Sequence, residues 1–421
     1  MVLELVSAAV LLLSGRGNPY AAERRTAVVA ELADAGAEMS GGEEDEPILA
    51  LHPYLGFVYN PDRETFDMGR PVSPFGFHTD DPIRWSGESD DELRIAIVGG
   101  SMAAHMALRG REAIESALAD CQALGEREVA VISLALGGYK QPQQLATVAY
   151  FLSLGARFDV VVNLDGVNEL VWYVRHARRN GIDPSYPYNW YWMTLQAFDP
   201  ASHADMERIA SARKWRRRLA RSLDVAGAHR WASGQLVWRA LSGSIDRRES
   251  AAELRLQRRE QVGAGPRRFQ QTGAVYERFD SDEEALAGGA ALWRRGSALT
   301  RDLVEAQGIP YLHLLQPNQH FPGTKPLTGH EREAFAGEAS MYHGPLSAGY
   351  EHLLREGERL TAAGVDFVDL SRIFDDHPEE LYVDDCCHVN VEGNRILGAA
   401  VGRLICERLD APAPGRPAAV R

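Results

Sequence analysis

The chain has 421 residues, of which 45% are hydrophobic and 25% are charged, and these values are typical of a folded globular protein of one large or two ordinary domains. Its formal net charge of -14 argues against a duplex nucleic-acid binder, because such a protein needs a basic face to neutralise phosphate. Four scattered cysteines without a C-x-x-C pair are too few for a disulfide framework and argue against a structural zinc site.

The chain begins with a short apolar stretch, MVLELVSAAVLLLSGRG. It is shorter than the roughly 20 residues that span a bilayer, and it lacks the basic start and the cleavage site of a secretory signal. Two interpretations stay open: an amphipathic helix of a cytoplasmic protein, or the remnant of an anchor that associates an extracytoplasmic protein with a membrane. Residues 34–47, DAGAEMSGGEEDEP, predict a linker, so 1–47 is expected to be an N-terminal segment and linker.

Five short aliphatic runs follow, most of them apolar at successive positions, as expected for strands covered on both faces. They are 93–98, 129–134, 158–164, 309–315 and 365–370. Helical patterns lie between and after them, at 111–124, 143–154, 296–307, 346–363 and 391–409. This alternation predicts an α/β domain with a parallel sheet of about five strands, in two parts of the chain, 48–172 and 293–410. Residues 411–421 are expected to be a flexible tail.

Residues 173–292 interrupt the alternation, since they contain no convincing central strand. They begin with an aromatic segment, SYPYNWYWMTLQAFDP, and continue into the basic run KWRRRLARSL. We expect a mostly helical insertion between the third and fourth strands, with Tyr186 and Trp190 forming part of a lid or wall over a binding site. The basic run is typical of a solvated helix face, and contact with a membrane surface or an acidic partner is the alternative.

Open α/β sheets bind ligands at the carboxyl ends of their strands, and four short blocks follow predicted strands or precede the last helix. They are Gly99-Gly100-Ser101, Gly137-Gly138, Gly166-Val167-Asn168-Glu169 and Asp385-Cys386-Cys387-His388. Each alone has an ordinary interpretation: a turn, a strand exit, a helix cap, or a helix lead-in or metal cluster. Together they supply a nucleophile, backbone donors, an amide donor and a base with a nearby carboxylate, which is what acyl transfer requires.

The order of these blocks resembles the SGNH, or GDSL-type, hydrolase superfamily over residues 50–172 and 293–410. Gly100 stands where that family usually has the aspartate of its name, Ser133 stands near a frequent asparagine, and Glu169 replaces a common aspartate. The resemblance implies a flavodoxin-like, three-layer α/β/α domain that hydrolyses or transfers ester-linked acyl groups without a cofactor, on a small-molecule, lipid or glycan ester.

The same resemblance assigns roles to individual residues. Ser101 is the expected nucleophile, His388 the base, and Asp385 the carboxylate that orients His388. The amides of Ser101 and Gly138 and the side chain of Asn168 are the expected oxyanion hole.

Polar residues after the fourth strand, Gln316 and Asn318, are expected at the same rim, in contact with substrate. A metal at 385–388 is disfavoured, because four consecutive residues do not easily converge on one tetrahedral ion. His105 is interpreted as a packed histidine of the first helix.

The expected activity is therefore that of a serine-dependent ester hydrolase, of the carboxylesterase or acetylesterase type. An O-acyltransferase acting on a cell-envelope glycan would use the same residues, and a non-catalytic binding module could keep the same fold. The acyl group, the alcohol and the oligomeric state are not indicated by any motif in the sequence.

Overall fold

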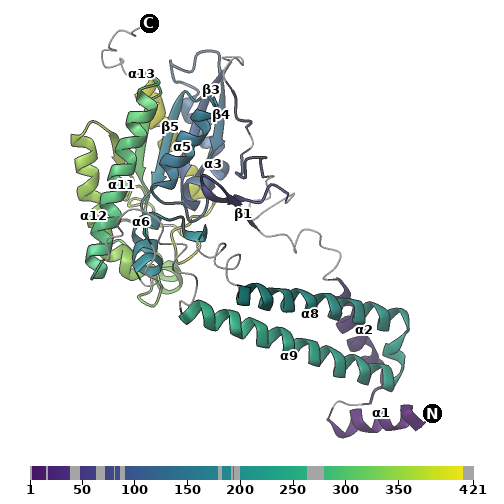
Figure 1. Ribbon diagram of the computed structural model, residues 1–421. Helices are drawn as coiled ribbons and strands as arrows, with labels where there is room; N and C mark the ends of the chain where they lie inside the picture. The colour runs from purple at the N-terminus through teal and green to yellow at the C-terminus, as the bar shows by residue number, and fades with distance from the viewer. Residues whose placement is uncertain are drawn as a thin grey trace. The chain divides into compact units, whose positions relative to one another are not determined.

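A computed structural model describes residues 2–15, 18–37, 48–62, 72–79, 81–85, 91–178, 183–190, 193, 200–262 and 279–410. The chain divides into two compact units (Figure 1). The first, here called the sheet unit, comprises Ile48–Tyr191 and Gln270–Arg421, and the second, the hairpin unit, comprises Met1–Pro47 and Trp192–Phe269. Each unit is described below by itself.

The sheet unit is built on five parallel strands in the order β4-β3-β5-β6-β7. The strands are β3 (Glu92–Gly99), β4 (Glu128–Ser133), β5 (Val160–Asp165), β6 (Tyr311–Leu315) and β7 (Asp366–Asp369). Every residue of β5 and all but the first residue of β3 are buried, which is why these strands are mostly apolar in sequence, with Arg94, Asn163 and Asp165 as buried polar exceptions. The predicted parallel sheet is confirmed.

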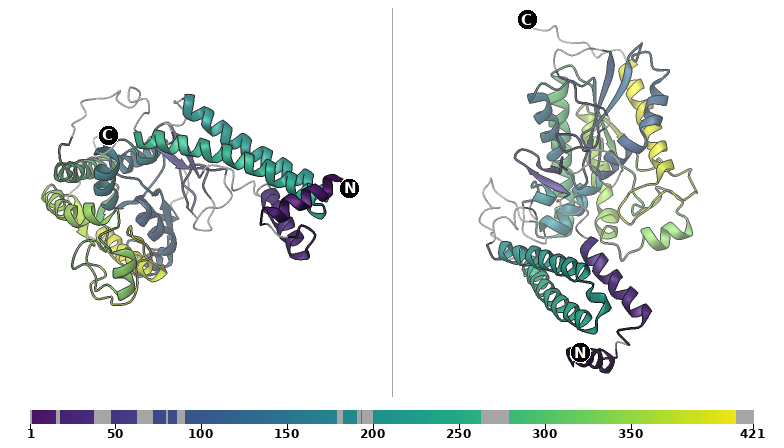
Figure 2. Two further views of the ribbon diagram at one scale, coloured as in Figure 1. Left: turned by 90° about the horizontal axis from the view of Figure 1, so that it is seen from below. Right: turned by 90° about the vertical axis from the view of Figure 1, so that its right-hand side faces the viewer.

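Helices cover both faces of this sheet, so that it is the middle of three layers (Figure 2). One layer contains α3 (Ser101–Arg109), α4 (Arg111–Leu118) and α13 (Val391–Asp410). The other contains α5 (Gln143–Ser153), α6 (Val167–Trp172), α11 (Asp282–Glu305) and α12 (His343–Ala362). The expected three-layer α/β/α architecture is thus observed.

A β-hairpin and two short helical turns of the sheet unit were not expected from the sequence. An antiparallel hairpin, β1 (Leu49–His52) with β2 (Gly56–Tyr59), forms ahead of the first predicted strand, in a part of the chain where no strand was predicted. Two π-helical turns, η1 (Tyr173–Arg178) and η3 (Glu331–Phe335), also belong to the sheet unit.

The predicted insertion 173–292 is too wide at both ends. At its start, η1 belongs to the sheet unit, and at its end, α11 begins 14 residues before its predicted start at 296. Helix α11 packs on α5, α6 and η1.

The hairpin unit contains the predicted helical insertion. Its elements are α1 (Val2–Leu13), α2 (Ala22–Ala37), α8 (Pro200–Val225), the 3-10 turn η2 (Ala228–Arg230) and α9 (Ala232–Val262). Helix α2 packs on α8 and α1 packs on α9, so the first 37 residues are part of this unit's fold. Two small cores hold it together, one around Trp238 and Val28 and one around Ala232 and Leu11.

The predicted linker 34–47 overlaps the end of α2, which continues to Ala37, and its remainder lies outside the described residues. The expected tail 411–421 also lies outside them. Among the helices that the structure describes, none is long and apolar enough to cross a membrane.

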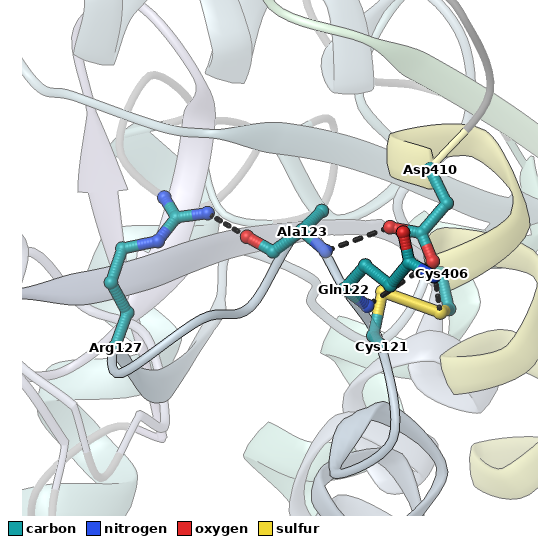
Figure 3. The surroundings of a disulfide bond; sticks show 6 residues. All are labelled: Cys121, Gln122, Ala123, Arg127, Cys406 and Asp410. Carbon is teal, nitrogen blue, oxygen red and sulfur yellow. Dashed lines mark hydrogen bonds between the residues drawn. A yellow bond between two sulfur atoms is a disulfide. The ribbon is translucent and has the colours of Figure 1, made fainter.

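A disulfide joins Cys121, just after α4, to Cys406 of α13 (Figure 3). The Cα atoms are 5.4 Å apart and the two residues are 285 positions apart in sequence. The carboxylate of Asp410 accepts hydrogen bonds from the backbone amides of Gln122 (3.2 Å) and Ala123 (2.7 Å) beside it. The low cysteine count argued correctly against a framework of several disulfides, but it did not indicate this single bridge.

Candidate active site

Ser101 is the first residue of α3, and Gly100 alone separates it from the end of β3. The two glycines before it are required by close contacts. Gly99 has φ +144, and a Cβ there would lie 2.1 Å from the carbonyl oxygen of Leu164, while a Cβ at Gly100 would lie 2.5 Å from Nδ2 of Asn168. The glycines therefore let β3 pass close to β5 and bring the serine next to Asn168.

His388 lies beside Ser101, although the two residues are 287 positions apart. The distance from His388 Nε2 to Ser101 Oγ is 2.6 Å, so the imidazole and the hydroxyl are within hydrogen-bond reach. The structure thus brings these two predicted residues together. Both side chains are partly buried.

The carboxylate that contacts His388 belongs to Asp384, and the prediction of Asp385 is wrong in this respect. Asp384 Oδ2 bonds Nδ1 of His388, and its Oδ1 accepts the backbone amides of residues 386, 387 and 388 at 3.0–3.2 Å. Asp385 instead accepts a hydrogen bond from Ser340 Oγ at 2.9 Å. The tight turn 384–388 points successive side chains in different directions, so a spacing of four residues, not three, reaches the ring.

The surroundings of His388 favour its protonated form. Burial alone would lower its pKa, but the neighbouring Cys387 sulfur and the hydrogen bond and charge of Asp384 raise the pKa to about 9. Burial, together with the charge of His388, lowers the pKa of His105 to about 3. The His105 ring lies 4.7 Å from that of His388, so a neutral, packed imidazole stands next to the charged one.

Asn168 and the loop at Gly137-Gly138 lie around the serine. A Cβ at Gly137 would be 3.9 Å from Cβ of Ser101, which places this loop beside the hydroxyl. Asn168 Oδ1 accepts the indole N–H of Trp172 (3.0 Å), and Nδ2 donates to the carbonyl of Tyr139 (2.8 Å). These two bonds fix the orientation of the amide, with its N–H groups on the side of Gly100 and Tyr139.

Glu169 ties together the loops that carry Gly138 and Asn168. It is fully buried, and its two carboxyl oxygens accept the amides of Gln141 (3.0 Å) and Gly166 (3.1 Å). Burial and the nearby Asp165 raise the pKa of Glu169 to about 8. In the sequence, Glu169 stood out only as a departure from the family pattern. In the structure, it is buried and its hydrogen bonds hold together two loops of the site.

The described part of the aromatic segment, residues 183–190, reaches the site through Tyr188. Its ring stacks on Trp172 with centroids 3.9 Å apart, and its Cδ1 would lie 3.3 Å from a Cβ on Gly138. The buried ammonium of Lys140 holds the segment by donating to the backbone carbonyls of Pro184 and Tyr186. Tyr186 and Trp190, the predicted contact residues, form an edge-to-face pair with each other at 5.6 Å.

The two predicted rim residues after β6 are buried. Asn318 is 0% exposed and donates to the carbonyl of Cys386 (3.0 Å), so it holds the loop before His388. Gln316 is 3% exposed. Neither presents surface to a ligand, and their expected contact with substrate is therefore not supported. Side chains of residues 318–320 form hydrogen bonds with the backbone carbonyls of residues 384–386. Because buried carbonyl groups need such partners, these bonds explain why the segment is polar.

Cys386, Cys387 and His388 are close enough to share a metal ion, with ligand atoms within 4.8 Å of one another. However, both ring nitrogens of His388 already bond Asp384 and Ser101. The two thiols are free and their sulfurs are 3.1 Å apart. The donor set is thus short of a tetrahedral site, and the geometry favours the serine and histidine chemistry.

The sequence did not indicate Lys140 or Trp172 as site residues, and it indicated Tyr188 only as a member of the aromatic run 186–192 that was expected to form a lid or wall. Trp172 follows Asn168 by four positions, a helical spacing that could have predicted contact between the two side chains. Nothing comparable points to Lys140, because its partners are backbone carbonyls more than 40 residues away.

Comparison with known proteins leaves the assignment to the geometry. No protein-family model matches the chain. No curated protein matches its sequence significantly.

Proposed function

We propose that the protein is a serine-dependent ester hydrolase that acts through an acyl-enzyme on Ser101. The observation that carries the proposal is the chain of contacts from Asp384 through His388 to Ser101. A serine hydroxyl is a poor nucleophile until a base takes its proton, and the neutral form of His388 can take it. The carboxylate of Asp384 keeps the imidazole in the tautomer whose Nε2 faces Ser101.

The proposed reaction has two steps. Ser101 Oγ attacks the ester carbonyl while its proton passes to His388 Nε2, and the alcohol leaves with that proton. Water then attacks the acyl-enzyme with His388 again as base, which releases the acid and restores the serine. In both steps the carbonyl oxygen becomes negative.

Donors for this oxyanion lie next to the serine. Ser101 opens α3, and the first amides of a helix have no partner within it. The loop of Gly138 and the oriented amide of Asn168 lie on the same side. We assign these three groups to the oxyanion hole, where removal of one donor costs about 3 kcal/mol of transition-state stabilisation. Asn168→Ala is a direct check of this magnitude through kcat.

The decisive experiment is turnover of short-chain nitrophenyl esters by the wild type and Ser101→Ala. We expect hydrolysis of the acetyl ester by the wild type and a loss of at least about 10³-fold in the variant, because no other group replaces the nucleophile. Ser153→Ala, an exposed serine at the end of α5, is the matched control and should keep full activity. Equal rates from wild type and Ser101→Ala would refute the assignment.

A fluorophosphonate probe separates the alternatives that share this fold. A hydrolase or an acyltransferase forms a covalent adduct at Ser101, whereas a binding module forms none. If the wild type labels but hydrolyses esters only slowly, and an added acceptor alcohol takes up the acyl group, the protein is a transferase.

A further inference from the structure

Helix α1 presents an entirely apolar outer face. Its inward positions are Glu4, Ser7, Ala8 and Leu11, which recur at helical spacing and pack toward α9. The remaining residues face outward over about half of the helix circumference. These eight are Val2, Leu3, Leu5, Val6, Ala9, Val10, Leu12 and Leu13. A surface helix of a globular protein normally carries polar residues on this side.

The only charged side chain of α1 is used within the unit. The carboxylate of Glu4 accepts the backbone amides of Ala232 and Ser233 at the start of α9, and it accepts the hydroxyl of Tyr20 at 2.8 Å. These bonds lower the pKa of Glu4 to about 2, against the effect of burial. The helix is therefore fastened to α9 while its apolar face stays outside, with Leu13 89% exposed and Leu5 64% exposed.

Aromatic and basic residues lie beside this attachment. Trp231, immediately before α9, is 58% exposed, and Tyr20 is 40% exposed with the guanidinium of Arg25 5.9 Å from its ring centroid. Arg230 is the last residue of η2, next to Trp231. Residues 200–262 carry 14 Lys and Arg against 7 Asp and Glu, in a chain whose net charge is -14. The excess of basic residues in this acidic protein thus lies in the segment that forms α8, η2 and α9, whereas residues 1–47 of the same unit carry 3 Lys and Arg against 9 Asp and Glu.

We propose that the hairpin unit docks on an anionic lipid bilayer through α1. The helix would lie in the plane of the interface with its outer face among the acyl chains, and Trp231 and Tyr20 would sit at the level of the headgroups. Arg25 and Arg230 would contact anionic headgroups. A bilayer fits better than a protein partner, because it accepts a fully apolar half-cylinder that ends in aromatic and cationic groups.

The proposal does not depend on the esterase assignment, and its test requires no turnover. Co-flotation of the full chain with vesicles is measured, once with phosphatidylcholine alone and once with phosphatidylcholine and phosphatidylglycerol. We expect binding to the anionic vesicles, weakened by salt. The double variant Leu5→Gln with Leu13→Gln should lower partitioning at least about tenfold, because each leucine loses its burial in lipid. Each of Arg25→Gln and Arg230→Gln should lower it about fivefold on anionic vesicles only.

The matched control replaces two exposed leucines of the sheet unit, Leu51→Gln with Leu299→Gln, and should bind as the wild type does. Circular dichroism of each variant verifies that it is folded. The proposal is overturned if the wild type does not bind vesicles, or if both double variants bind equally. It is also overturned if α1 joins two copies of the chain, in which case the Leu5 and Leu13 variant turns a dimer into a monomer and vesicles bind neither.

Discussion

Two adjacent aspartates precede the histidine of the proposed catalytic site, and they differ in what they bond. The Asp384 carboxylate forms hydrogen bonds with Nδ1 of His388 and with three backbone amides, whereas the Asp385 carboxylate accepts a hydrogen bond from the hydroxyl of Ser340. The family pattern of an aspartate three residues before the histidine favoured Asp385. In the structure, the carboxylate that contacts His388 is that of Asp384, four positions before the histidine.

Replacing each aspartate in turn tests this assignment. Asp384→Asn should lower kcat on a nitrophenyl ester by about 10⁴-fold, because the amide no longer fixes the tautomer that presents Nε2 to Ser101. Asp385→Asn serves as its matched control and should leave kcat within a few-fold of the wild type. A larger loss in Asp385→Asn than in Asp384→Asn would contradict the orientation of the two side chains.

The protonation of His388 predicts the pH dependence of the reaction. Its pKa is raised to about 9, and only the neutral imidazole can accept the proton of Ser101. We therefore expect kcat/KM to rise about tenfold per pH unit below the midpoint and to level off above pH 9. Because the Cys387 sulfur helps to raise this pKa, Cys387→Ala should move the midpoint to lower pH. A midpoint that stays in place or moves upward would contradict that cause.

Residue types and their order along the chain were enough to predict that Ser101, Asn168 and His388 lie near one another. Each follows a strand or precedes a helix, and the carboxyl ends of parallel strands meet at one edge. That Asn318 is buried rather than exposed at the rim of the site could not be predicted in this way. Its burial depends on where the loop 384–388 passes, and this loop is far away in sequence.

At the scale of elements, tight contacts between loops determine the shape of the site. Because Gly99 and Gly100 have no Cβ, Leu164 and Asn168 can lie close to their backbone. Glu169 accepts hydrogen bonds from the backbone amides of two separate loops. The strands were predictable because both faces of the sheet are covered, which leaves short runs of mostly apolar residues. Helices α1 and α2 were not expected to pack on the insertion, because their partners α8 and α9 lie about 200 residues further along the chain.

The disulfide between α4 and α13 predicts a stabilising effect on the sheet unit. It closes a loop of 285 residues, so its loss should increase the entropy of the unfolded chain and cost about 2–5 kcal/mol. We expect Cys121→Ser with Cys406→Ser to lower the melting temperature of this unit by several degrees. Cys386→Ser is the matched control, since Cys386 is a free thiol, and should leave the melting temperature nearly unchanged. Equal melting of all three proteins would show that the bridge does not constrain the fold.

At the scale of the whole molecule, the chain has two units with separate hydrophobic cores. Trp238 packs with Val28, Leu32 and Ala220 in the hairpin unit. Trp293 is fully buried in the sheet unit, where its indole donates to Asp165 at 2.5 Å. The proposed active site is built from residues of the sheet unit alone, and the proposed lipid-binding surface from residues of the hairpin unit alone. Catalysis and attachment are therefore expected to be separable.

Calorimetry of two tryptophan variants tests this separation. We expect two unfolding transitions in the wild type, since units with independent cores need not unfold together. Trp238→Ala should cost about 3–5 kcal/mol of stability and lower only the transition of the hairpin unit, leaving fluorophosphonate labelling of Ser101 intact. Trp293→Ala should lower only the other transition and abolish labelling, because α11 would lose its packing on the sheet. A single transition that both variants lower equally would mean that the two units unfold together. Substitutions in the hairpin unit could then alter catalysis by destabilising the sheet unit.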